Sequence, residues 1–293
     1  MRMKKKLLFL TAIFCALLCL AGCSQKPAPK ASDKVNIVTS TNIYADISKQ
    51  LAGRYGNVHA IIANGDIDPH DFDPTTQSAK TVARADIVVE NGSGYDSWMD
   101  RLADANDKKI VSVAQDVMGY KSDSNPHIWF DLDMPRKYAN YLTKRLIKLQ
   151  PQHRAYFEKR RRVFLNELAE VEKIAQDKHG RGQKVYVSEP VFDYALQDLG
   201  YKVGNKAFED AIERETDPSP RVIQQMKSGL HKHEVAFFVN NEQASSSTVK
   251  TFLRICKQEG VPIVNVRETK PNKISYLDWL KQSYQKVGKI SAK

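Results

Sequence analysis

The chain has 293 residues, 42% of them hydrophobic, and a formal net charge of +11. This length is sufficient for one large domain or two of ordinary size, each with its own hydrophobic core, so we expect a globular protein. The basic residues are scattered along helical segments such as "EKRRRVF", without an interleaved aromatic patch or a nucleic-acid-binding motif, which argues against a nucleic-acid partner.

The start of the chain has the features of an export signal. "MRMKKK" is positively charged, and "LLFLTAIFCALLCL" is an apolar stretch shorter than the roughly 20 residues of a membrane-spanning helix. The next segment, "LAGC" at 20–23, resembles the bacterial lipoprotein box, whose cysteine is lipidated and becomes the first mature residue. We therefore predict a signal peptide over residues 1–22 and lipidation at Cys23. The alternative is an ordinary signal peptide with a cysteine there by chance.

A lipidated tether is predicted over residues 23–34, because "SQKPAPKASDK" is small, charged and proline-containing. A single acyl chain binds membranes only marginally, so we expect a diacyl group on Cys23 to hold the exported protein on the outer face of the cell membrane. Two further cysteines fall inside the signal, which leaves Cys256 without a disulfide partner in the mature chain. Loss of the four basic residues of the signal lowers the net charge to +7.

Short β-branched segments alternate with helical patterns through the rest of the chain. The predicted strands are 35–40, 58–63, 86–91, 109–113, 184–188, 234–240 and 261–266. The predicted helices are 43–51, 75–85, 95–104, 190–199, 219–228 and 246–258. Strands that alternate with helices predict an α/β protein with mainly parallel sheets, covered by helices on both faces.

This alternation stops in the middle of the chain, where residues 135–178 carry no strand pattern. After Pro151 the sequence places apolar residues on one stripe amid charge, and a helix of that length would extend about 40 Å. We predict two lobes, over 35–150 and 180–293, joined by one long rigid helix over 151–179. The alternative is a single interrupted sheet with a long surface helix.

Two segments of the first half place a histidine directly after a proline. In "DIDPHDFDP", residues 66–74, two prolines stiffen the loop around His70, and its aspartates are candidate acceptors for the imidazole. In "SNPHIWFD", residues 124–131, His127 precedes a tryptophan and a phenylalanine that would limit water, with Asp131 as a candidate acceptor. A lone histidine is usually structural, but these contexts make both histidines candidate metal ligands.

The second half offers carboxylates at the ends of predicted strands. Glu189 follows a strand in "VYVSEPVFDY", and Glu268 follows another in "VNVRETKP". Ligands in parallel α/β sheets bind beyond the carboxyl ends of the strands, which favours a functional role for both glutamates. A charge that stabilises the start of a helix is the alternative.

Taken together, these segments resemble the metal-receptor class of ABC-transporter solute-binding lipoproteins, which serve zinc and manganese uptake. The resemblance covers nearly the whole mature chain. The family motif DPHxxxP is matched around His70, and a second motif, DPHxWLD, is matched by "NPHIWFD". The family's third ligand lies in a segment like "SEPVFDY". Its last carboxylate lies in a "TDS" or "TET" turn, which is matched by "RET". The resemblance implies that His70, His127, Glu189 and Glu268 are the metal ligands, two from each lobe, in the cleft between the lobes.

The chain departs from the family pattern at a few positions. Asn125 replaces the usual aspartate before the proline, Glu268 stands where many members have aspartate, and Asn240 lies near a position where some members have an acid. No histidine-rich loop is present. "HKH" at 231–233 is interpreted as a surface turn, with an auxiliary metal site as the alternative, and His59, His153 and His179 lack a supporting context.

The resemblance implies a monomeric receptor that binds one divalent ion and passes it to a permease with a cytoplasmic ATPase. The chain has no P-loop of its own. A secreted metal-dependent hydrolase is a second class, but the chain has neither HExxH nor Gly-x-Ser-x-Gly, so we expect no enzyme. A surface adhesin with a structural metal stays open, since a lipid anchor permits it.

The identity of the ion is left open by the donor set. Two imidazoles and two carboxylates suit Mn²⁺ or Fe²⁺ better than a three-histidine site does. Zn²⁺ is nevertheless expected to bind the same donors more tightly, from the Irving–Williams order. The prediction is therefore one ion as cargo, Mn²⁺ or Zn²⁺, with Fe²⁺ as a further candidate.

Overall fold

The computed structural model describes residues 34–67, 69, 72–176, 178–243 and 246–291. The predicted signal peptide, Cys23, the tether up to residue 33 and His70 lie outside these ranges. From Val35 onward the chain packs as one compact unit, so the lobe boundaries near 150 and 180 stay a prediction. No helix in the described ranges is long and apolar enough to cross a lipid bilayer.

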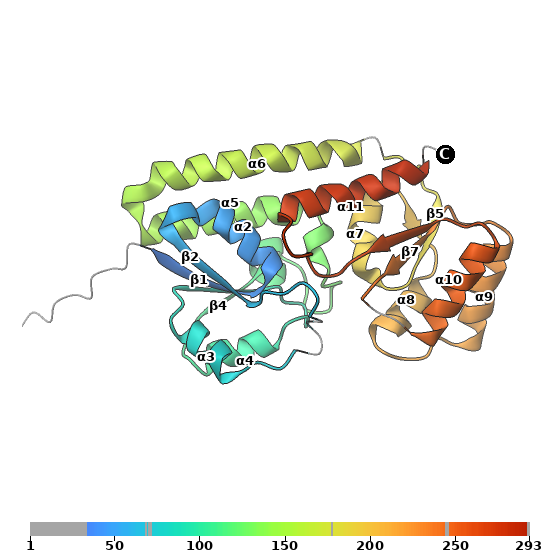
Figure 1. Cartoon of the computed structure of the whole chain (residues 1–293), viewed down its shortest axis with the longest axis horizontal. Coiled ribbons are helices and arrows are strands. Elements are labelled where there is room, and N and C mark those ends of the chain that lie inside the picture. Colours follow the sequence, from blue (N-terminus) through green and yellow to red (C-terminus); the bar gives the residue numbers. More distant parts are fainter. Residues whose placement is uncertain (1–33, 68, 70–71, 177, 244–245, 292–293) are drawn as a thin grey trace, which may run out of the picture. The chain divides into compact units, whose positions relative to one another are not determined.

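Two four-stranded sheets form the cores of two lobes (Figure 1). The first sheet has the order β2-β1-β3-β4 and the second has the order β6-β5-β7-β8. All neighbouring strands in both sheets are parallel. The predicted two-lobed parallel α/β fold is confirmed, and the alternative of one interrupted sheet is wrong. The strands are β1 (Val35–Thr41), β2 (Gly56–Ile62), β3 (Ile87–Glu90), β4 (Ile110–Ser112), β5 (Lys184–Val187), β6 (Lys202–Val203), β7 (Phe238–Asn241) and β8 (Ile263–Val266).

Helices account for most of the remaining described residues. Three of them, α5, α8 and α11, lie in segments for which the sequence predicted no helix. The helices are α2 (Asn42–Ala52), α3 (Thr76–Ala83), α4 (Trp98–Asp104), α5 (Asp133–Leu149), α6 (Arg154–Gln176), α7 (Asp193–Asp198), α8 (Lys206–Glu213), α9 (Pro220–His231), α10 (Ser247–Gln258) and α11 (Tyr276–Ser291). Short 3₁₀ turns precede α6 and α7.

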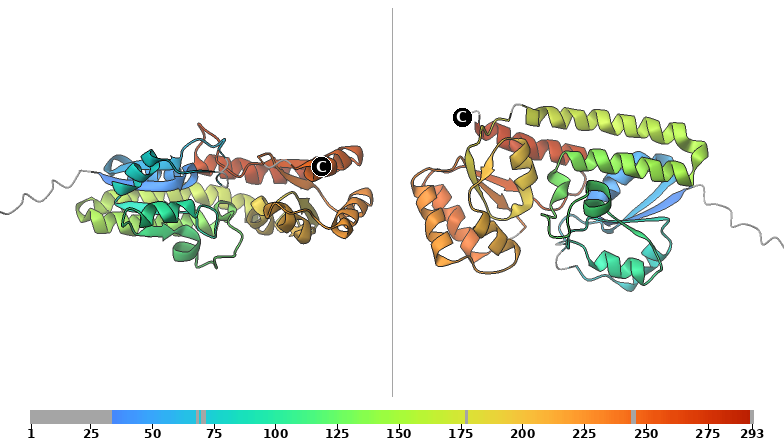
Figure 2. Two further views of the ribbon diagram at one scale, coloured as in Figure 1. Left: turned by 90° about the horizontal axis from the view of Figure 1, so that it is seen from below. Right: turned by 180° about the vertical axis from the view of Figure 1, so that it is seen from behind.

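The long central helix is present as α6, and its predicted apolar stripe is buried. Phe157, Phe164, Leu168, Val171 and Ala175 all face the core. α6 packs against α5 and also against α11, which returns from the end of the chain. Both views show α6 and α11 side by side along the two lobes (Figure 1 and Figure 2). The lobes are therefore joined by more than one helix.

Each sheet is covered on both faces because its strands bury side chains on alternate sides. In the first sheet Val38 faces α3 and α4, whereas Ile37 faces α2, α5 and α6. In the second sheet Phe238 faces α8, α9 and α10, whereas Val239 faces α7 and α11. The inner faces of the two sheets belong to one continuous hydrophobic cluster, so the lobes share a core.

Candidate metal centre

The carboxyl ends of β5, β7 and β8 bring three polar side chains of the second lobe together. β7 pairs with β5 on one side and with β8 on the other, so their ends lie at one edge of the sheet. Glu189 follows β5, Asn241 ends β7, and Glu268 lies just beyond β8. The parallel topology that the sequence predicts thus positions both predicted glutamates.

The side-chain amide of Asn241 joins the two glutamates. Its Nδ2 donates to Glu189 Oε2 at 2.8 Å and to Glu268 Oε2 at 3.4 Å. Its backbone N–H donates to Ser188 Oγ at 2.9 Å, which fixes the amide at the strand end. The three residues are buried, with exposed fractions of 9% for Glu189, 2% for Asn241 and 6% for Glu268. A neutral donor between two buried carboxylates reduces their mutual repulsion and holds their spacing.

His127 faces Glu268 from the first lobe and is fully buried. Its Nε2 lies 3.9 Å from Glu268 Oε1. On the other side of the ring, Nδ1 lies 2.7 Å from Asn125 Oδ1, which also accepts the His127 backbone N–H at 3.0 Å. Because an amide oxygen only accepts, this contact puts the proton of a neutral ring on Nδ1. The Nε2 lone pair is then on the side of the ring that faces Glu268.

The loop that carries His127 is held from both lobes. Asn125 Nδ2 donates to the carbonyl of Pro190 at 2.8 Å, and the Tyr194 hydroxyl donates to the Asn125 carbonyl at 2.9 Å. From the first lobe, Asn91 Nδ2 donates to the Pro126 carbonyl at 2.9 Å. These bonds hold the backbone of the loop, and the contact with Asn125 Oδ1 orients the imidazole ring itself.

The aromatic surroundings of His127 agree only in part with the prediction. The Trp129 ring stands edge-on to the imidazole, with centroids 5.2 Å apart. Phe130 instead packs on Phe192 and Trp279, away from the imidazole. The predicted acceptor Asp131 binds the Tyr120 hydroxyl and the backbone of Asp133, so the acceptor for His127 is Asn125.

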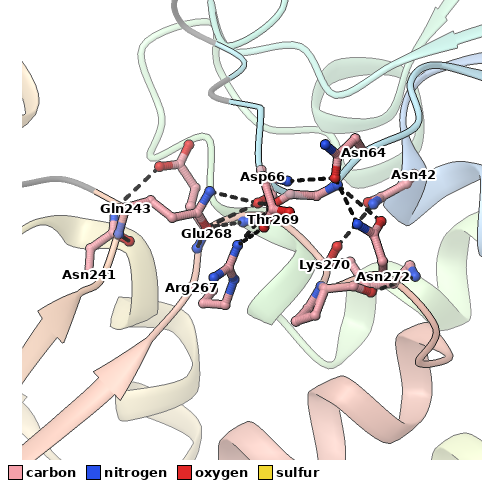
Figure 3. A network of polar contacts seen from close by, with 12 residues as sticks. Asn42, Asn64, Asp66, Asn241, Gln243, Arg267, Glu268, Thr269, Lys270 and Asn272 are labelled. Atoms are coloured by element: carbon pink, nitrogen blue, oxygen red, sulfur yellow. Dashed lines mark hydrogen bonds and ion pairs between the residues drawn. The ribbon is translucent and has the colours of Figure 1, made fainter.

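The turn that carries Glu268 is bonded to the loop that leads toward His70. Arg267 Nη2 donates to the Gly65 carbonyl at 3.0 Å and to Asp66 Oδ1 at 2.9 Å, and the Thr269 hydroxyl also donates to the Gly65 carbonyl. Figure 3 shows this network between the two segments. His70 itself lies outside the described residues, but the segment that precedes its loop is fixed beside Glu268.

Gln243 supports the same turn from inside the second lobe. Its Oε1 accepts the backbone N–H groups of Glu268 at 2.9 Å and Thr269 at 3.0 Å, and its Nε2 donates to Thr269 Oγ1 at 2.7 Å (Figure 3). Neither Gln243 nor Asn241 was singled out by the sequence, which drew attention to Asn240 instead. Asn240 bonds to Asn265 on the neighbouring strand.

A cavity of about 530 Å³ lies beside the His127 loop. Both lobes line it, with Asp123 and Asn125 from the first and Lys206, Asp210 and Glu213 among those from the second. Glu213 also reaches the centre, because its Oε1 lies 3.9 Å from His127 Nε2. The sequence gave no signal for this contact, since Glu213 sits on the unpredicted helix α8.

The centre thus brings together three of the predicted ligands: His127, Glu189 and Glu268. Among the described side chains, no three His, Cys, Asp or Glu residues form a group that could already hold an ion. The fourth predicted ligand lies outside those residues. What the described part shows is an imidazole nitrogen and carboxylate oxygens from opposite lobes, buried and facing each other.

A model of the family described as "Zinc-uptake complex component A periplasmic" matches residues 37–289. The chain belongs to this family. The metal ABC transporter substrate-binding lipoprotein ScbA of Streptococcus cristatus is 28% identical over 310 positions, covering 97% of this chain and 98% of the relative. The manganese ABC transporter substrate-binding lipoprotein scaA of Streptococcus gordonii is 27% identical over 316 positions, covering 99% of this chain and 100% of the relative.

Solved structures show the same fold. The solute-binding protein FpvC of P. aeruginosa, solved in complex with Ni²⁺, has a TM-score of 0.72 and 19% identity, covering 88% of this chain and 97% of FpvC. At that identity the similarity supports the architecture alone. The family resemblance predicted from the motifs is confirmed by the match over residues 37–289.

Other histidines of this zinc-uptake family member lie away from the centre. His231 bonds Glu259 at 2.9 Å, and "HKH" is an exposed turn at the end of α9, as predicted. His153 stacks on Tyr55 with ring centroids 3.6 Å apart, and His59 lies on β2.

Proposed function

We propose that the protein is the substrate-binding lipoprotein of an ABC transporter, which captures one divalent transition-metal ion and delivers it to a membrane permease. The observation that carries this proposal is the approach of His127 Nε2 to Glu268 Oε1, at 3.9 Å, across the two lobes of a protein of this family. Names of relatives that specify metal and manganese transport support it.

The proposed ligands are His70, His127, Glu189 and Glu268. Two imidazole nitrogens and two carboxylate groups suit Mn²⁺ or Zn²⁺, and Fe²⁺ is a weaker candidate. Burial of the glutamates favours binding, because two carboxylates in a poorly hydrated site attract a divalent cation more strongly than they would in water. Asn241 contributes by holding both carboxylates at a fixed spacing before the ion arrives.

Each lobe contributes to binding in a different way. The first lobe supplies an imidazole whose tautomer is set by Asn125, so that the lone pair of the neutral ring lies on Nε2, the nitrogen proposed to bind the ion. The second lobe supplies the negative charge. Release then requires the lobes to separate slightly, and we infer that the permease complex provides that work, since the chain contains no P-loop. The receptor itself performs no catalysis in this scheme.

Membrane attachment belongs to the same proposal. We infer that residues 1–22 are removed, that Cys23 carries the lipid, and that residues 23–34 tether a monomeric receptor to the outer face of the cell membrane. The three parts that follow are a first lobe over 35–150, a linking helix over 151–179 and a second lobe over 180–293.

The test is a metal titration of the mature protein, purified in detergent and freed of metal by a chelator. We expect one equivalent of Mn²⁺ or Zn²⁺ to bind, with no turnover. Glu268→Gln, which keeps the side-chain volume, should weaken binding by at least tenfold. If the wild-type protein binds neither ion in stoichiometric amount, the proposed function is wrong.

A further inference from the structure

Glu213, the last residue of α8, approaches the imidazole of His127 as closely as a proposed ligand does. Its Oε1 lies 3.9 Å from His127 Nε2, the same separation that joins Nε2 to Glu268 Oε1. Bonds from nitrogen and oxygen to Zn²⁺ or a similar ion are about 2.0–2.2 Å long. One ion can therefore touch Glu213 and His127 together, with an angle of about 125° at the ion when both bonds are about 2.2 Å.

The exposure of Glu213 distinguishes it from the other donors. Its side chain is 22% exposed, compared with 8% for Glu268 and 1% for His127. Glu213 also lines the cavity of about 530 Å³ that both lobes border. Its carboxylate therefore stands between the cavity and the buried imidazole.

Neighbouring charges on α8 are engaged with one another. Lys206 Nζ lies 2.8 Å from Glu209 Oε1 and 3.0 Å from Asp210 Oδ1. Lys206, at the start of the helix, is thus paired with Glu209 and Asp210, whereas Glu213 lies at the opposite end of α8 and faces the other lobe.

We propose that Glu213 is an additional protein ligand, which supplies an oxygen donor on the cavity side of the metal centre and raises preference for an ion that accepts more than four donors. This inference rests on the proposed function. Zn²⁺ is usually satisfied by four donors in a tetrahedral arrangement, whereas Mn²⁺ favours oxygen-rich coordination with a larger number of donors. An extra carboxylate therefore strengthens Mn²⁺ binding more than Zn²⁺ binding.

The test compares Mn²⁺ and Zn²⁺ affinities of the full mature protein by calorimetry or chelator competition. For Glu213→Gln we expect Mn²⁺ binding to weaken by about tenfold or more and Zn²⁺ binding by less than about threefold. The glutamine variant keeps an amide oxygen that can still bind weakly, whereas Glu213→Ala removes every side-chain oxygen. The alanine variant should therefore lose at least as much affinity for Mn²⁺. Thermal melting of each metal-free variant checks that the fold is intact.

Asp123→Asn is the matched control, because Asp123 lines the same cavity and the change removes the same charge. We expect it to weaken both ions equally and by less than about threefold. Unchanged Mn²⁺ affinity in both Glu213 variants overturns the inference, and so does an equal loss for both ions, which would reflect charge rather than coordination. These outcomes leave the proposed function standing, since it fails only if the wild-type protein binds neither ion.

Discussion

Asn125 stands where the family pattern has an aspartate, and its amide makes two contacts of opposite kind. Oδ1 accepts from the backbone and ring of His127, while Nδ2 donates to the carbonyl of Pro190 in the other lobe. An aspartate would keep the first contact but would place a second negative oxygen against a carbonyl. The substitution therefore exchanges some basicity of the imidazole for a direct bond between the lobes.

Asn125→Ala should weaken metal binding by about 10- to 100-fold, because the imidazole loses the group that sets its tautomer and orientation. Calorimetry with Zn²⁺ measures the loss. Asn125→Asp is the control, since it restores the acceptor for Nδ1 and should recover most of the affinity. Wild-type affinity in Asn125→Ala would show that the ring is held by other contacts.

The sequence predicted some residues of the centre and missed others for a physical reason. Glu189 and Glu268 were found because each lies just past a predicted strand, where a rule about strand ends applies, and because their segments resemble family motifs. The sequence did not show which of Asn240 and Asn241 bonds to the glutamates, because that depends on the register of β7 between β5 and β8. Glu213 could not be found at all, because its position depends on how an unpredicted helix packs.

Among the elements, the segment after β2 and the turn after β8 form a network that crosses the lobes. Asn42 Nδ2 donates to the Lys270 carbonyl at 2.9 Å, and Asn272 Nδ2 donates to Asn64 Oδ1 at 2.7 Å. Gly65 lies where the two segments come closest. A Cβ at this position would collide with the carbonyl of Lys270. Only glycine allows the two backbones to approach this closely.

Gly65→Ala should therefore lower the free energy of unfolding by about 1–3 kcal/mol and weaken metal binding, because the backbone beside Glu268 must shift. Urea denaturation and a Zn²⁺ titration measure the two effects. Gly288→Ala in α11 is the control, since a Cβ there meets nothing and alanine favours a helix, so stability should be equal or higher. Equal behaviour of the two variants would argue against close packing at Gly65.

A buried acid at the end of β3 makes the first lobe sensitive to pH. Burial, reinforced by the charges of Asp96 and Asp100, raises the pKa of Glu90 to about 9. In an unfolded chain a glutamate titrates near about 4.3. Because the folded pKa is the higher one, the protonated glutamate favours the folded state. That contribution is complete below about pH 4 and is lost as the pH rises through about 9.

Glu90→Gln, which stays neutral, should remove this loss. We expect the variant and the wild-type protein to have similar stability near pH 5, and the variant to be more stable by about 1 kcal/mol or more at pH 8. Urea denaturation of metal-free protein between pH 5 and pH 8 is the measurement. Parallel pH profiles for the two proteins would mean that Glu90 stays ionised in the folded state.

Element predictions succeeded where the pattern is local and failed where packing decides. Strands of the sheets were recognised because they are short runs rich in β-branched residues, and β3 and β7 are buried throughout. α5, α8 and α11 were missed, since their apolar residues are mixed with charged ones and their buried faces are defined by elements that are distant in the sequence, such as α2 and α6. β6 was missed because it has only two residues.

At the scale of the whole molecule, the lobes are joined through one hydrophobic core as well as through the hydrogen bonds of the His127 loop. α11 bonds directly to the segment that follows His127: the Tyr276 hydroxyl donates to the Trp129 carbonyl at 2.6 Å, and the Tyr284 hydroxyl donates to the Phe130 carbonyl at 2.8 Å. Such a core resists large rotation of one lobe against the other. Metal capture is therefore expected to involve small displacements of the loops around the centre.

This shared core leads to a prediction about unfolding with and without metal. Because the inner faces of both sheets belong to one cluster, the metal-free protein should unfold in a single transition. An ion held by donors from both lobes binds only the folded state, so free metal at about 1,000 times its Kd should add about 4 kcal/mol. Urea denaturation followed by both fluorescence and circular dichroism measures the two quantities.

Glu268→Gln separates the metal contribution from the packing contribution. It keeps the volume of the side chain and an oxygen that can accept from Asn241, so metal-free stability should change by less than about 1 kcal/mol. The increment from metal should fall by about 1.4 kcal/mol for each tenfold loss of affinity at a fixed metal concentration. If the variant retains the full increment, Glu268 does not bind the ion. If the metal-free protein instead unfolds in two steps, the lobes are independent, and the ion rather than the core is what joins them.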